Sequence, residues 1–182
     1  LNLADFFRLN GISYEALPIE TNDEGKENLF AGRCDVYTTD ASGLSSTRAA
    51  ASNPDKWVVL PEIISKEPLG PLVRHGDHQW GDVVRWSLNA MIIAEELGIT
   101  SENVDAQTSS NVPEVLRLLG VEGNYGEMLE LSNDWAYQII KQIGNYSESY
   151  EANVGPDTPL EIARGLNALW TQGGILYAPP FR

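Results

Sequence analysis

His75 and His78 are the only histidines of the chain, and they stand three residues apart in the sequence HGDH. Two imidazoles at this spacing, with Asp77 between them, could bind a metal ion. A structural zinc site takes four ligands, however, and the sequence has no second cluster of Cys or His to supply the other two. We therefore predict that this segment is a solvated loop and that the chain holds no metal.

The sequence also lacks the residues that nucleophilic or acid–base catalysis would need. Cys34 lies inside a strand-like run with no base placed beside it, and the sequence has no G-x-S-x-G motif. Adjacent carboxylates such as Glu95 and Glu96 are expected to be solvated charges on a helix face. The glycines of GVEGNYG do not have the G-x-G-x-x-G spacing of a nucleotide-binding loop. The sequence thus predicts neither catalysis nor a cofactor.

Composition narrows the classes of partner. The chain has 182 residues, of which 42% are hydrophobic and 21% charged, and this balance is typical of a folded protein. Twelve Lys and Arg against 26 Asp and Glu give a net charge of −14, and the basic residues are scattered singly. Nucleic acid is excluded as a partner, because phosphate binding needs clustered cations. The longest nearly apolar stretch, residues 90–94, is far shorter than the roughly 18 residues that cross a bilayer.

The first 60 residues alternate between helical and strand-like patterns. Helix and strand are predicted in turn over residues 1–9, 12–19, 24–31, 34–39, 42–51 and 57–60. This order predicts βαβ units and a mainly parallel sheet with helices on both faces. Such sheets bind ligands at the carboxyl ends of their strands, where Thr38, Thr39 and Asp40 lie. Asp40 is equally suited to cap the following helix, and the residues alone leave both roles open.

Beyond residue 60 the sequence no longer alternates between helical and strand-like patterns. Residues 61–76 carry three prolines and two glycines around a short apolar run, which is typical of an extended crossover. Beyond them, helices are predicted over residues 79–97, 112–119, 133–153 and 159–171. Their apolar faces are expected to bury four tryptophans in a core, namely Trp80, Trp86, Trp135 and Trp170.

Four stretches carry a resemblance to a known family: GRCDVYTTDASGL (32–44), VVLPEIISKEPLGPLVRHGD (58–77), NDWAYQIIKQIGNY (133–146) and ARGLNALWTQGGILYAPPFR (163–182). Over nearly its whole length the sequence resembles the general amino-acid-binding proteins of ABC transporters, which are type II periplasmic binding proteins. The resemblance implies an α/β fold of two lobes, with mainly parallel sheets, helices on both faces and a helix-rich C-terminal part. Residues 1–60 would form the second lobe without its first strand, residues 61–74 the crossover, and residues 75–182 the C-terminal part of the first lobe.

The resemblance also implies a function and a site. The protein would capture a free L-amino acid between its lobes and present it to a membrane permease, in the periplasm and after removal of a signal peptide. Asp40 would pair with the ligand's ammonium group, with Thr38, Thr39 and Ser42 adding hydrogen bonds. Cys34 would form a disulfide with a partner outside this chain. Because family members are nearly twice as long, we expect the chain to lack its N-terminal part and to associate through the incomplete lobe.

Two other classes stay open at this point. One is an enzyme on the same two-lobed scaffold, such as a dehydratase, because one fold hosts many functions. The other is the ligand-sensing module of a receptor. Turnover of a substrate would favour the enzyme, whereas a rise in thermal stability with free amino acids and no turnover would favour the binding protein.

Overall fold

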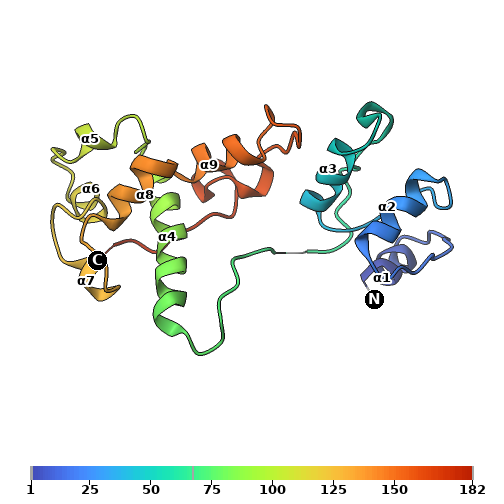
Figure 1. The fold of residues 1–182 in the computed structure, drawn as a ribbon, viewed down its shortest axis with the longest axis horizontal. Coiled ribbons are helices and arrows are strands. Elements are labelled where there is room, and N and C mark those ends of the chain that lie inside the picture. The colour runs from blue at the N-terminus through green and yellow to red at the C-terminus, as the bar shows by residue number, and fades with distance from the viewer. Residues whose placement is uncertain (1, 67, 182) are drawn as a thin grey trace. The chain divides into compact units, whose positions relative to one another are not determined.

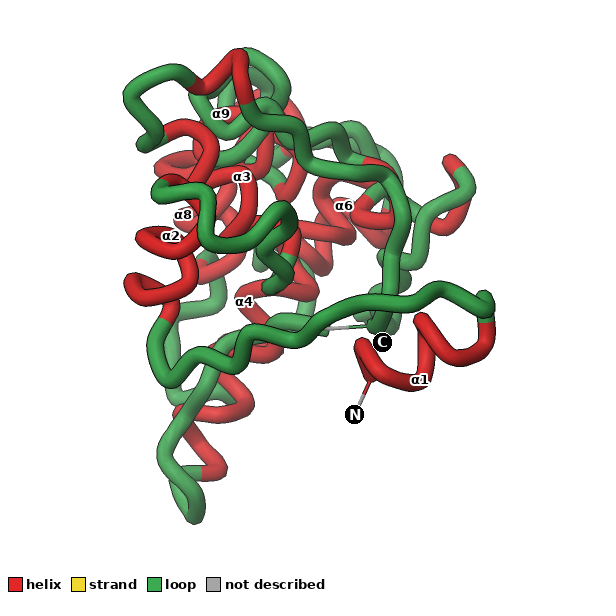
Figure 2. The backbone as a smooth tube through the Cα atoms, turned by 90° about the vertical axis from the view of Figure 1, so that its right-hand side faces the viewer, coloured by secondary structure: helices red, strands yellow, loops and turns green. Residues whose placement is uncertain are grey.

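The computed structural model describes residues 2–66 and 68–181. The chain divides into two compact units, Leu1–Gly70 and Pro71–Arg182, whose helices are labelled in Figure 1. The described residues form helices joined by loops, with no strand among them (Figure 2). A single isolated bridge joins Leu169 and Leu176.

In the first unit, the described residues form three short α-helices and one 3-10 turn: α1 (Asn2–Leu9), α2 (Asn22–Phe30), α3 (Ala41–Ala49) and η1 (Pro54–Lys56). Side-chain caps set where two of them begin. Thr21 accepts a hydrogen bond from the Glu24 N–H at the start of α2, and Asp40 accepts one from the Gly43 N–H at the start of α3. These helices agree with the predicted ranges to within two residues.

The three strands predicted in this unit are not observed in the described residues. Residues 12–19, 34–39 and 57–60 are loops, and no ladder of backbone hydrogen bonds joins them. Alternating and β-branched side chains express a local preference, but a strand forms only when a neighbouring strand pairs with its N–H and C=O groups. The parallel sheet expected from these segments is accordingly not part of this structure.

The second unit is built around the 19-residue helix α4 (His78–Glu96), against which α8 (Trp135–Ile143) and α9 (Tyr146–Asn153) pack. The shorter elements are α5 (Val104–Gln107), α6 (Pro113–Leu118), α7 (Tyr125–Met128), η2 (Gly165–Asn167) and η3 (Trp170–Gln172). No described helix has the length and apolar character needed to cross a membrane. The helices predicted over 79–97 and 112–119 are confirmed as α4 and α6.

Two of the predicted helices differ from the structure. The helix expected over 133–153 is broken at Gly144, which has a φ of +91° and ends α8, and Asn145 then caps α9. The helix expected over 159–171 is wrong: its residues form loops and the turns η2 and η3. Glu161 has a φ of +52°, and a residue in the left-handed region cannot continue a right-handed helix.

The apolar core of the described chain lies in the second unit. Its buried hydrophobic residues run from Ala90 in α4 to Phe181, and the aromatic rings of Trp86, Tyr125 and Trp135 surround the Phe181 ring. Two of the four tryptophans expected in the core are not buried. Trp80, in the first turn of α4, and Trp170, the first residue of η3, are 55% and 51% exposed.

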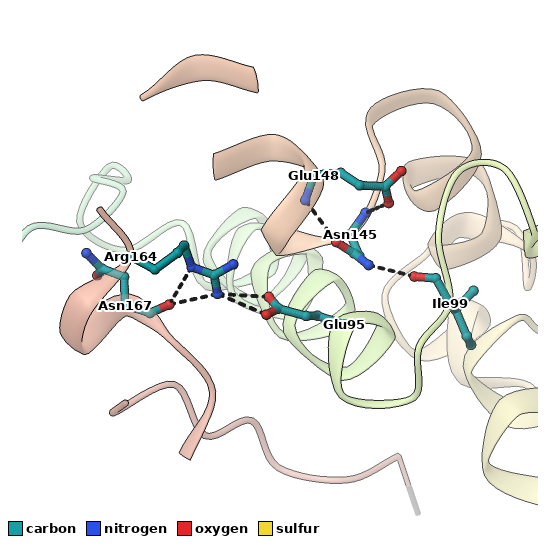
Figure 3. A network of polar contacts seen from close by, with 6 residues as sticks. All are labelled: Glu95, Ile99, Asn145, Glu148, Arg164 and Asn167. Atoms are coloured by element: carbon teal, nitrogen blue, oxygen red, sulfur yellow. Dashed lines mark hydrogen bonds and ion pairs between the residues drawn. The ribbon is translucent and has the colours of Figure 1, made fainter. Parts of the chain in front are cut away.

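Arg164 fastens the C-terminal segment to α4 (Figure 3). Its guanidinium lies 3.0 Å from the Glu95 carboxylate, and the two side chains are only 16% and 9% exposed. The prediction that Glu95 is a solvated charge is therefore wrong, because the carboxylate is buried against this arginine. The same guanidinium donates to the Asn167 carbonyl and lies over the rings of Tyr146 and Tyr150. With its charge neutralised and its N–H groups bonded, this arginine can be held in a mostly buried position.

Candidate functional site

Asp40 is the candidate residue with the most defined surroundings. It directly precedes α3, with an extended backbone (φ −62°, ψ 153°) that lets its side chain fold back over the first turn. Its Oδ1 accepts a hydrogen bond from the Gly43 N–H at 2.8 Å and another from the Ser42 hydroxyl. The structure therefore gives Asp40 the helix-capping role, which was one of the two roles that the sequence left open.

These hydrogen bonds favour the charged form of the carboxylate. The bond from Ser42, followed by the one from the Gly43 N–H, lowers the pKa of Asp40 below its ordinary value of 3.8. The second oxygen, Oδ2, has one long contact, 3.5 Å from the Thr39 hydroxyl. An ionised carboxylate with one lightly used oxygen can accept a strong hydrogen bond from a cationic N–H donor.

The other predicted site residues divide into two groups. Ser42 and Thr39 both reach the Asp40 carboxylate, although Ser42 is exposed and Thr39 only half-buried. Thr38 is exposed and makes no hydrogen bond with these three side chains within the described part of the chain. The structure thus brings three of the four predicted residues together and leaves Thr38 beside them.

Gly43 belongs to this site and was not predicted from the sequence. A methyl group placed on its Cα would lie 2.9 Å from Asp40 Oδ2 and 3.3 Å from the Thr39 side chain. A glycine at the third position of α3 therefore keeps the space beside the lightly used oxygen open. The available signal was the pattern D-x-x-G, in which a capping aspartate precedes a glycine whose backbone N–H it accepts.

Contacts between α2 and the loop before Asp40 hold the segment that leads to the site. The Tyr37 hydroxyl donates to the Asn22 side chain at 3.1 Å. The Tyr37 ring lies so close to buried Gly25 that an added Cβ would be 2.5 Å from a ring carbon. Arg33 donates to the buried Asn28 side chain at the end of the same helix. The loop is therefore fixed at two points without any strand pairing.

The remaining sequence candidates stand apart from this site. Cys34 is half-buried and has no disulfide partner among residues 2–66 and 68–181. His75 and His78 are both exposed, and Asp77 caps α4 by accepting from the Trp80 N–H. Throughout the described chain, no three His, Cys, Asp or Glu side chains gather in a way that could hold a metal ion.

Comparison with known proteins identifies the sequence's relatives. No family model matches the chain. Over its whole length it is 55% identical to BztA of Rhodobacter capsulatus, a "glutamate/glutamine/aspartate/asparagine-binding protein". It is also 55% identical to AapJ of Rhizobium johnstonii, a "general L-amino acid-binding periplasmic protein". The chain is a homologue of amino-acid-binding proteins of ABC transporters. YhdW of Escherichia coli, a "putative amino-acid ABC transporter-binding protein", is 53% identical over the same length.

A solved structure agrees with these relatives. The fold matches an ABC transporter periplasmic binding protein from Brucella ovis with glutathione bound, with a TM-score of 0.91 and 50% identity across the full chain. The resemblance that the sequence carried is therefore confirmed. The chain spans about half the length of the proteins that it matches, 54% of the three sequence relatives and 57% of the Brucella chain.

Proposed function

We propose that this chain is part of the substrate-binding component of an amino-acid ABC transporter, which captures a free L-amino acid and presents it to a membrane permease. The observation that carries this proposal is identity of 53–55%, over the whole of this chain, to proteins named for amino-acid binding. The same relatives are named as binding proteins rather than enzymes, and the name of AapJ places that relative in the periplasm. We extend both properties to this chain.

In the proposed architecture the ligand is enclosed between two lobes with mainly parallel sheets. Residues 1–60 belong to one lobe, residues 61–74 cross between the lobes, and residues 75–182 belong to the other. Support comes from the TM-score of 0.91 to a periplasmic binding protein. Hinge closure around the ligand would create the state that a transporter recognises.

Asp40 is proposed to hold the ligand's α-ammonium through Oδ2, while Oδ1 continues to cap α3. The geometry of the carboxylate supports this role, because the cap leaves Oδ2 with only the long contact to the Thr39 hydroxyl. Thr39, Ser42 and Thr38 would supply additional hydroxyl contacts, and Cys34 a disulfide to a partner outside the chain. The relatives' stated ligands, and the glutathione of the Brucella protein, share an α-ammonium and an α-carboxylate. The constant ammonium is thus the group that a fixed aspartate would recognise.

The test compares two capping aspartates. Asp40→Asn keeps a good N-cap residue but removes the charge, so α3 should persist while amino-acid binding weakens by about tenfold or more. Asp77→Asn makes the same change at the cap of α4 and should leave binding unchanged. Binding of each of the twenty amino acids and of glutathione is measured by calorimetry.

Each titration is made on two proteins. One is the 182-residue chain, and the other is a chimera in which this chain replaces the matching segment of BztA of Rhodobacter capsulatus. If neither form binds any of the twenty amino acids or glutathione, the proposed function is wrong. If both bind but Asp40→Asn behaves like Asp77→Asn, the function stands and the role of Asp40 does not.

A further inference from the structure

A small cavity of about 170 Å³ opens at the end of α4, in the second unit. Ile93 of α4 and Leu97, the residue after α4, contribute apolar lining, which we call the floor of the cavity. Two aromatic side chains of the C-terminal segment stand over it, Trp170 and Tyr177, and their rings meet edge to face at 5.6 Å. Trp170 is 51% exposed and Tyr177 69% exposed, so both side chains are reached from solvent.

The loop that carries the two rings is closely fixed. The Trp170 N–H donates to the Leu176 carbonyl, and the Ile175 N–H donates back to the Leu166 carbonyl. Gly174 lies so near the Ala168 carbonyl that a Cβ there would collide with it. The Trp170 indole N–H donates to the Glu96 carboxylate at 3.0 Å, which sets the orientation of the ring. The aromatic walls are thus held in place before any ligand arrives.

The electrostatics of the cavity favour a cation. Glu96 and Glu114 line it, whereas no Lys or Arg is among its described lining residues. Glu114 has no hydrogen-bond or ion-pair partner in the described chain, and the indole N–H bonds only one of the two Glu96 oxygens. The last turn of α4 ends at Glu96, and the carbonyls at a helix C-terminus carry partial negative charge. Arg117, three residues beyond Glu114 in α6, does not line the cavity and donates to the Phe181 carbonyl.

We propose that this cavity is a binding site for an organic cation, an ammonium group on a short apolar stem. The stem would lie on the Ile93 and Leu97 floor, and the ammonium would sit between the aromatic faces and the two carboxylates, where cation–π attraction and ion pairing act together. The volume suits one such group, because a cavity of about 150 Å³ accommodates benzene. The site is separate from Asp40 and does not depend on the function proposed above.

The test uses n-butylammonium as the probe and n-butanol as its neutral counterpart of equal length. Binding is followed on the ¹⁵N-labelled chain through the indole N–H signals of Trp170 and Trp80. The Trp80 indole is similarly exposed but lies outside the cavity, so it serves as an internal control. We expect saturable shifts of the Trp170 signal with n-butylammonium, a much weaker response to n-butanol, and a Trp80 signal that does not move.

Two variants separate the contributions of charge and ring. Glu114→Gln and Tyr177→Leu change exposed or half-buried side chains and should each weaken n-butylammonium binding about two- to fivefold. Glu122→Gln removes an exposed carboxylate that does not line the cavity and should leave binding unchanged. Raising the ionic strength should also weaken binding, because the carboxylates are reached from solvent.

A blocked lysine, N-acetyl-lysine methylamide, distinguishes a free amine from a basic side chain as the natural source of the cation. If it binds as well as n-butylammonium, the cavity accepts a lysine side chain from a partner; if it does not, the cavity is a site for small amines. The proposal is overturned if n-butanol shifts the Trp170 signal as much as n-butylammonium does. It is equally overturned if n-butylammonium moves neither signal, or if Glu114→Gln and Glu122→Gln behave alike.

Discussion

A carboxylate at a helix N-cap needs only one oxygen for the cap. At Asp40 that oxygen is Oδ1, which accepts from Ser42 and from the Gly43 N–H, while Oδ2 has only the long contact with Thr39. Capping and ligand binding are therefore compatible at this residue, although they looked like alternatives in the sequence. Substitutions beside the two oxygens should therefore have different effects. A change at Ser42 acts on Oδ1, and a side chain added at Gly43 acts on Oδ2.

Removing the Ser42 hydroxyl tests what keeps Asp40 charged. Its hydrogen bond is the largest cause of the lowered pKa, so Ser42→Ala should raise the Asp40 pKa toward the ordinary 3.8. A lowered pKa in the folded state stabilises the fold above pH 3.8, and this contribution is lost as the pH falls through the lower folded value. Ser42→Ala should make this contribution to stability smaller. An NMR titration of the Asp40 carboxyl carbon measures the change, and Ser46→Ala, at an exposed position of the same helix, should leave the titration unaltered.

A methyl group at Gly43 tests the space beside Oδ2. Gly43→Ala would place that methyl 2.9 Å from the oxygen, so we expect glutamate binding to weaken by about tenfold, the loss of one charge-assisted hydrogen bond. An alanine inside a helix otherwise adds about 0.5–1 kcal/mol of stability. Gly81→Ala in α4, where an added methyl meets only a Val73 methyl at 3.6 Å, is the control. Calorimetric binding reduced equally in both variants would contradict the role given to Oδ2.

At the scale of elements, the sequence predicted the helices whose ends and apolar faces are set by nearby residues. The helices α2, α3, α4 and α6 follow from apolar spacing, capping residues and glycine or proline boundaries, all of which act within a few residues. The strands depended on partners far away in the chain, and no local pattern reports whether those partners pair. The failed helix over 159–171 had the right apolar spacing, but spacing does not reveal a left-handed residue such as Glu161.

The candidate site, like the helices, was predictable only where its residues are neighbours in the sequence. Asp40, Thr39 and Ser42 are neighbours in sequence, so their proximity required no knowledge of the fold. Gly43 was missed because its importance lies in an absent side chain. The exposure of Trp170 was missed for a different reason: its helical spacing suggested a core position, and only the closed loop that carries it turns the ring outward.

The Arg164–Glu95 pair is the contact between elements with the clearest energetic consequence. Glu95→Gln would leave the Arg164 charge mostly buried without its counter-ion, and breaking such a pair costs about 3 kcal/mol or more. Asp82→Asn breaks the Arg85–Asp82 pair, whose side chains are 71% and 50% exposed, and should cost less than about 1 kcal/mol. Urea unfolding followed by the fluorescence of the buried tryptophans measures both. Equal losses would mean that the buried pair does not fasten the C-terminal segment.

At the scale of the whole molecule, the two units differ in what they bury. Every buried hydrophobic side chain of the described residues lies between Ala90 and Phe181. The buried polar residues of the first unit are Asn28, Ser45 and Thr47, while large apolar side chains such as Val58 and Leu60 are 77% and 56% exposed there. Since burial of apolar surface is the dominant favourable term in folding, the second unit should be the more stable one.

Hydrogen exchange tests this difference on the intact 182-residue chain. The amides of α4 and α8 should exchange only through global opening of the second unit, because both helices bury residues of the core. Those of α2 and α3 should exchange much faster, since their buried positions are glycine and polar residues. Mass spectrometry of peptic fragments measures the protection of each helix. If glutamate slows exchange in α3 but not in α8, glutamate binding stabilises the first unit. Equal protection of α3 and α8 without ligand would mean that the first unit has a stability not explained by the side chains that it buries.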